Sequence, residues 1–163
     1  MAVTAATLTS TITDSITLNG STYGNTVTKT ITNIHDVYQR IITVPTSEIT
    51  LYTTADSVVG GSAFDEDFVK YVRITNTDTT NFISLVLESD GSAGSDGDEA
   101  QFKLEAGQSF ILRGHKDVFN STAEGANVTA GTFTTDQDSI KTVTAIANTA
   151  AVDVEVFIAS TNA

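Results

Sequence analysis

The chain contains no cysteine, no tryptophan, a single proline and no long apolar run. Without cysteine, disulfides, zinc-thiolate sites, iron-sulfur clusters and thiol nucleophiles are all excluded. No segment approaches the roughly 20 consecutive apolar residues that a membrane-spanning helix needs. A chain of 163 residues is the size of one domain, which buries roughly 70% of the surface that its unfolded chain exposes. We therefore expect one domain over residues 1–163 with a core that needs no cross-links.

Basic residues are also scarce, because 8 Lys and Arg stand against 20 Asp and Glu and leave a net charge of −12. A surface of this sign repels phosphate backbones and anionic lipid, so we expect neither a nucleic-acid nor a membrane partner. Residues 1–15 have neither the basic start nor the apolar centre of a signal peptide. We expect synthesis in the cytoplasm without an export signal.

Helical periodicity is missing, whereas apolar and polar residues alternate along much of the chain. Threonine is the commonest residue, and valine and isoleucine are frequent, which favours extended backbone. The clearest strand is 152–160, VDVEVFIAS, with four apolar side chains on one side and two carboxylates on the other. Similar strands are expected within 7–13, 26–32, 40–44, 48–52, 71–75, 82–88 and 139–147. This pattern predicts an all-β fold, an antiparallel sandwich or barrel.

In residues 101–112, QFKLEAGQSFIL, apolar and polar side chains alternate before and after a central Ala-Gly pair. Glycine readily adopts positive φ in a turn. We therefore expect a strand, a tight turn and a second strand, forming one hairpin of the core.

Residues 89–99, SDGSAGSDGDE, form an acidic stretch between two alternating segments. This position predicts a long hairpin loop. A calcium loop of the EF-hand kind requires carboxylates or amides at its third and fifth positions, where this stretch has Ser92 and Gly94. Asp96, Asp98 and Glu99 are the oxygen ligands that a calcium ion would use here, but we expect a solvated loop without a metal.

Catalytic patterns are not found. His35 and His115 each stand near an acidic residue in sequence, but such proximity does not orient an imidazole. The GGSAF segment at 60–64 has Phe64 where a nucleophile elbow requires glycine. We expect a protein that is not an enzyme and needs no cofactor.

Arg40 and Arg73 each fall inside a segment otherwise built for burial. A buried guanidinium needs a carboxylate or several carbonyls around it. We expect both to be structural anchors.

The threonine-rich residues 1–34 leave two alternatives. They are either edge strands of the same domain or an extended arm that pairs with a neighbouring sheet, since flat polar strands specify register weakly.

Two parts of the chain resemble small structural proteins of tailed-bacteriophage virions, particularly marine ones. The first is ITLNGSTYGNTVTKTITNIHDVYQRIITVPTSE at 16–48. The second is the series VRITNTDTTNFISLVLE, QFKLEAGQSFIL and VTAIANTAAVDVEVFIAS. Residues 113–138 are not covered by this likeness.

The resemblance implies a single antiparallel β-sandwich with jelly-roll topology, in a decoration or tail-associated protein that works by assembly and carries no catalytic residue. We expect a capsid decoration or cement protein in the virion, a homotrimer bound to the major capsid protein or to other virion proteins. One alternative is a neck, tail or fibre component. Another is a calcium-dependent adhesin for host-surface carbohydrate that uses the 89–99 loop.

Overall fold

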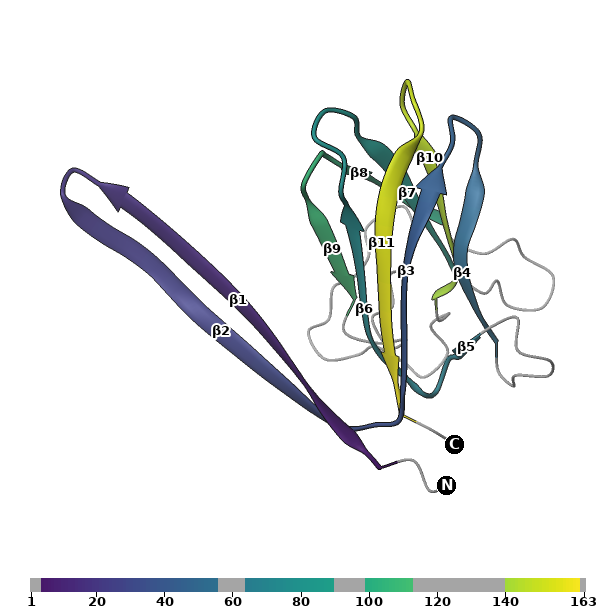
Figure 1. Cartoon of the computed structure of the whole chain (residues 1–163), viewed down its shortest axis with the longest axis horizontal. Helices are drawn as coiled ribbons and strands as arrows, with labels where there is room; N and C mark the ends of the chain where they lie inside the picture. The colour runs from purple at the N-terminus through teal and green to yellow at the C-terminus, as the bar shows by residue number, and fades with distance from the viewer. Residues whose placement is uncertain (1–3, 56–63, 90–98, 113–139, 162–163) are drawn as a thin grey trace, which may run out of the picture.

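The computed structural model describes residues 4–55, 64–89, 99–112 and 140–161. They form a body of two packed sheets and a long two-stranded arm that projects from one end of it (Figure 1). These described residues contain no helix, and therefore none long and apolar enough to cross a bilayer.

The body confirms the predicted all-β antiparallel sandwich. One sheet has the order β3-β11-β6-β9 and the other has the order β5-β4-β10-β7-β8. The strands of the first are Asp36–Val44 (β3), Val152–Ser160 (β11), Val69–Asn76 (β6) and Ser109–Leu112 (β9). The strands of the second are Phe64–Asp65 (β5), Ile49–Ala55 (β4), Ile140–Ala147 (β10), Ile83–Ser89 (β7) and Glu99–Leu104 (β8). All pairs are antiparallel except the short pair of β4 and β5.

The topology is that of a jelly roll. Strands β3 and β11, β4 and β10, β6 and β9, and β7 and β8 are antiparallel neighbours. The chain therefore runs as a long antiparallel ribbon that folds over on itself, so that the ribbon's strand pairs fall alternately in the two sheets.

The core lies between the two sheets and follows the predicted alternation. In β11, Val152, Val154, Val156 and Ile158 are at most 1% exposed. Strand β7 contributes Ile83, Leu85 and Leu87 from the opposite sheet in the same manner. Fully burying each such side chain contributes about 1.5–3 kcal/mol, which explains how the body dispenses with cross-links.

The prediction of a hairpin over 101–112 is wrong. Strand β8 pairs with β7 in one sheet, whereas β9 pairs with β6 in the other. Gly107, at φ +74°, makes the turn at which the chain passes between the sheets. Alternation and a glycine turn are common to hairpins and to such corners, so local sequence does not distinguish them.

The acidic stretch follows β7 and leads into β8, and these two strands pair with Glu88 opposite Glu99. Strands β7 and β8 are thus antiparallel neighbours, as the predicted hairpin loop between them requires. Residues 90–98, including Asp96 and Asp98, lie outside the described residues.

The arm consists of β1, Ala6–Leu18, and β2, Ser21–Ile34, which form a separate two-stranded sheet. Asn19 and Gly20, both at positive φ, make the two-residue loop at its tip, and such Asn-Gly loops match the twist of hairpin strands. Of the two alternatives for residues 1–34, the structure therefore has a projecting arm, but its strands pair with each other.

Candidate functional site

The two faces of the arm differ in chemistry. Cross-strand register places threonines opposite one another on one face. The hydroxyls of Thr11 and Thr28 share a hydrogen bond of 3.2 Å, and those of Thr13 and Thr26 another of 3.2 Å. These pairs stabilise the ribbon from one side.

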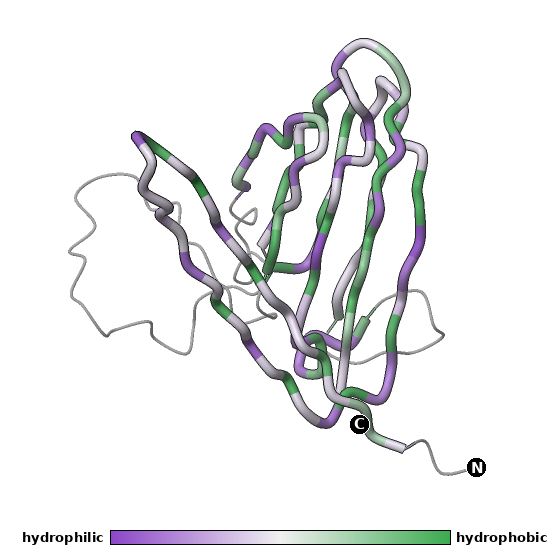
Figure 2. The backbone as a smooth tube through the Cα atoms, turned by 60° about the vertical axis from the view of Figure 1, so that its left-hand side comes forward, coloured by the Kyte–Doolittle hydropathy of each residue, from purple (hydrophilic) through white to green (hydrophobic). Residues whose placement is uncertain are grey.

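The opposite face of the arm is largely apolar. Paired rows along it are Leu8 with Ile31, Ser10 with Lys29, Ile12 with Val27, Asp14 with Asn25, Ile16 with Tyr23, and Leu18 with Ser21. Apolar and polar rows thus alternate, and hydropathy changes repeatedly along both arm strands (Figure 2). We call the side chains of Ile12, Ile16, Leu18, Tyr23 and Val27 the arm stripe.

The arm stripe is exposed to solvent. Its five side chains are between 52% and 61% exposed. Single exposed apolar residues are ordinary, but five on one face of one hairpin, separated only by the polar row of Asp14 and Asn25, mark an interaction surface. The arm stripe is therefore the strongest candidate for a functional site among the described residues.

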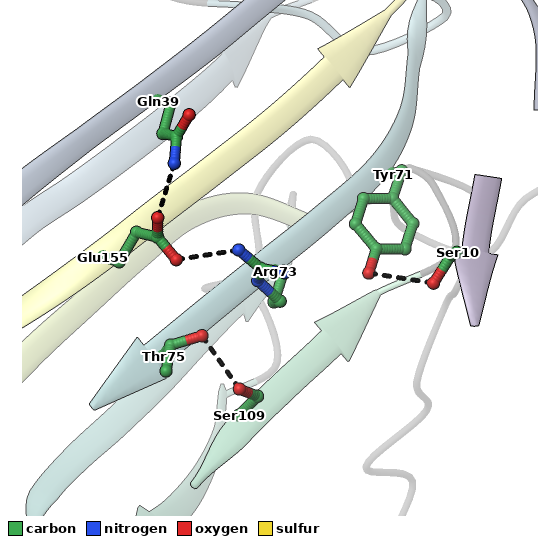
Figure 3. Close-up of polar contacts among 7 residues, drawn as sticks. All are labelled: Ser10, Gln39, Tyr71, Arg73, Thr75, Ser109 and Glu155. Carbon is green, nitrogen blue, oxygen red and sulfur yellow. Dashed lines mark hydrogen bonds and ion pairs between the residues drawn. The ribbon is translucent and has the colours of Figure 1, made fainter. Parts of the chain in front are cut away.

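The base of the arm already packs on the body. Ile34 forms a small buried cluster with Tyr71 and Ala159, and Leu8 and Ile31 pack against this cluster. Ser10 and Tyr71 share a hydrogen bond of 3.2 Å between their hydroxyls (Figure 3). These contacts anchor the arm on the outer face of the four-stranded sheet.

Beyond this cluster, several polar side chains on the same outer face are hydrogen-bonded across strands. Glu155 in β11 accepts hydrogen bonds from Gln39 in β3 at 2.6 Å and from Arg73 in β6 at 2.7 Å (Figure 3). Thr75 and Ser109 share a further hydroxyl contact of 2.8 Å. These bonds connect neighbouring strands, so they hold the face flat and fixed in register.

The pKa of Glu155 lies below its ordinary value, because Gln39 and then Arg73 stabilise the carboxylate against the opposing effect of burial. A carboxyl whose pKa is depressed on folding contributes stability above its unfolded pKa, and this contribution disappears as the pH falls through the folded pKa. We expect Glu155→Gln to lower the free energy of unfolding at pH 7 by about 0.5–1 kcal/mol, since the pair is partly exposed. The difference should shrink as the pH falls below 4.5, the ordinary value for Glu155.

Denaturant unfolding of both proteins across this pH range checks the expectation. Glu105→Gln is a suitable control, because Glu105 pairs with Lys103 on the surface, where both side chains are at least 50% exposed. A Glu155→Gln effect that does not vary with pH would contradict the role assigned to the carboxylate.

The two arginines predicted as anchors occupy different environments. Arg73 pairs with Glu155 at 2.7 Å and lies 5.6 Å from the centre of the Phe157 ring. Its Nε atom is buried and has no hydrogen-bond partner among the described residues. Arg40 is exposed on β3, an edge strand, with its guanidinium 5.6 Å from the centre of the Tyr38 ring. The position of β3 at the sheet edge, which sequence does not reveal, leaves Arg40 in solvent.

Glu99, the one calcium candidate within the described residues, is exposed at the start of β8. It lies opposite Glu88, whose pKa is raised by burial and by the charges of Glu99 and Glu48. No group of three or more His, Cys, Asp or Glu placed to hold a metal occurs within the described ranges. Asp96, Asp98 and His115 fall outside those ranges, and the Nε2 of His35 lies 3.2 Å from Oδ1 of Asn33.

Sequence reasoning did not identify the arm stripe, although a signal was present. Asn-Gly between two alternating segments is the strongest short-range indication of a hairpin, and it occurs here at Asn19 and Gly20. Once the two strands are paired across that loop, Ile12 faces Val27 and Ile16 faces Tyr23. Counting residues outward from this loop then shows which side chains share the apolar face.

Comparison of the chain with protein-family models, with curated proteins and with solved structures finds no match.

Proposed function

We propose that the chain is a non-enzymatic structural component of a tailed-phage virion, a decoration or cement protein of the capsid. The observation that carries the proposal is the arm stripe, an apolar surface on a projecting hairpin that none of the described residues covers. Such a surface is stabilised when another chain covers it. The virion assignment itself rests on the sequence segments described above, and the jelly roll, a fold found in viral capsid domains among others, is compatible with it.

The mechanism is multivalent binding. Each copy is a body stiffened by a continuous core, with an arm that reaches away from it (Figure 1). The partners are the major capsid protein and other copies of this chain, in a homotrimer. Several modest contacts that are held together act with a raised effective concentration, so the assembled shell resists opening more than any one contact would.

Binding to shells tests this function. Purified chain is added to shells of the phage that encodes it after their own copies have been removed, and bound protein is quantified after sedimentation. We expect binding that saturates in proportion to the major capsid protein, and shells that withstand higher temperature once decorated. Empty tails from the same phage serve as the control surface.

Copy number separates this proposal from its main alternative. A decoration protein occurs throughout the lattice, whereas a neck or tail component occurs at one vertex or along the tail. Binding to tails alone, or a copy number in complete virions that matches one ring, would replace the cement function by the neck, tail or fibre function.

A further inference from the structure

The described part of the chain exposes a second apolar surface besides the arm stripe. Val37 and Ile41 in β3 are 52% and 69% exposed. They are paired with Ala159 and Glu155 of β11, whose side chains lie on the outer face of the four-stranded sheet. We call Val37 and Ile41 the β3 stripe.

The two surfaces have the same spacing. Ile12 and Ile16 are separated by four residues along the arm, with Asp14 between them, as are Val37 and Ile41 along β3, with Gln39 between them. Four residues of extended chain span about 13 Å. When residues 12–16 of an arm lie along residues 37–41 of β3, Ile12 and Ile16 meet apolar side chains and Asp14 meets Gln39. Leu18 lies beyond the β3 stripe.

The arm does not cover its own β3 stripe. Its base is fixed on the body by Ile34, Leu8 and the Ser10–Tyr71 hydrogen bond. From that anchor the arm diverges from the four-stranded sheet (Figures 1 and 2). An arm that covers β3 must therefore come from another molecule.

The outer face of this sheet already accepts the apolar face of the arm within one molecule. Leu8 and Ile31 pack there beside Tyr71, Phe157 and Ala159. A neighbour's arm stripe on the β3 stripe would continue this packing toward the edge of the same sheet.

The contact area argues for a closed assembly. From Ile12 to Leu18 the arm face is about 20 Å long and about 10 Å wide. One arm on one sheet thus buries on the order of 400 Å² in total, below the roughly 1,200 Å² of a stable interface. Head-to-tail contacts form a ring when the rotation between copies closes. In such a ring each copy gives one arm and receives another, so these contacts add together.

We propose that the arm stripe of one copy binds the β3 stripe of a second copy, and that this exchange closes the homo-oligomer. The inference rests on the proposed assembly function and specifies which surfaces the copies use on each other.

Light scattering on four proteins tests the exchange. We expect the unmodified chain to be an oligomer. The mass should fall to that of a single chain in two variants. One is the arm variant Ile12→Thr/Ile16→Thr/Val27→Thr, and the other is the β3 variant Val37→Thr/Ile41→Thr. Threonine preserves strand propensity, and unchanged circular dichroism shows that each variant folds. The control Thr11→Ser/Thr13→Ser/Thr28→Ser, on the other face of the arm, should remain oligomeric.

Cross-linking identifies the partner surface, because the chain has no native cysteine. Ile16→Cys and Ile41→Cys chains, mixed and treated with a short bismaleimide, should form cross-linked dimers that neither chain forms alone. Thr13→Cys mixed with Ile41→Cys should not cross-link, since Thr13 lies on the other face. Cross-linking of Ile16→Cys to itself would overturn the proposal in favour of arm-to-arm contact.

A monomeric unmodified chain would also overturn the exchange. This result would not contradict the decoration function, because shell binding is measured separately. An arm that binds only the capsid protein is compatible with that function.

Discussion

Replacing Asn76 with alanine is expected to lower the free energy of unfolding by about 3–5 kcal/mol. Asn76 is completely buried at the end of β6. Its Nδ2 donates to the carbonyls of Asn81 at 2.9 Å and Leu104 at 3.1 Å, and its Oδ1 accepts from the backbone N–H of Asp78 at 3.0 Å. Removing the amide leaves these three backbone groups without that partner; the bond to Leu104 is buried and the other two are partly buried. An unsatisfied buried group costs about 1–3 kcal/mol, and the lost side-chain volume adds to this cost.

The position of Asn76 makes the effect global. Its own backbone bonds to Gln108 and Gly107, so one residue joins the turn after β6 to the corner where the chain passes from β8 to β9. Thermal unfolding should show a melting temperature lower by about 10 °C. Asn76→Asp should be destabilising as well, because a carboxylate cannot donate to the two carbonyls.

Asn148→Ala is the matched control for this experiment, because Asn148 is exposed after β10. Its melting temperature should stay close to that of the unmodified chain. Equal stability of Asn76→Ala and Asn148→Ala would show that water replaces the buried amide and that the corner does not depend on it.

The second large effect is expected in the arm, where Gly24→Ala should disrupt the pairing of β1 and β2. Gly24 has φ +157°, and a Cβ built there lies 2.0 Å from the backbone oxygen of Asp14. Backbone oxygen on the partner strand cannot move aside unless the ladder opens. The Ser15–Gly24 pair and its neighbours should therefore separate, and the arm stripe would no longer present one continuous face.

Amide hydrogen exchange measures this change residue by residue. Exchange should accelerate by at least tenfold across the distal arm and remain unchanged in β7, β10 and β11, because those strands share a separate core. The oligomer should be lost together with the arm. Gly20→Ala is the comparison without a steric clash, since nothing lies within 4 Å of its Cβ position. Its positive φ alone costs about 1–2 kcal/mol, so we expect its exchange to accelerate less than that of Gly24→Ala. Equal exchange in Gly24→Ala and the unmodified arm would contradict the steric prediction.

The residue pattern alone was enough to predict the class of fold and most of its strands. In a sandwich, one face of each strand is buried, so period-two alternation such as that of Val152, Val154 and Val156 is a direct consequence of burial. The same local signals identified the turn at Gly107, and the missing cysteines excluded whole classes of chemistry. For the proposed virion function, the sequence supplied a resemblance and no catalytic constellation.

Which strands are neighbours is visible only in the tertiary structure. The observed pairing makes residues 101–112 a corner and not a hairpin, and it places Arg40 at an exposed edge while Arg73 meets Glu155. It also buries Asn76 at a junction of three segments. It also shows that Leu8 and Ile31 are covered by the body while Ile12 and Ile16, in the same alternating pattern, are not. Local sequence encodes which side of a strand is apolar, but what covers that side depends on residues far away along the chain, or on another chain.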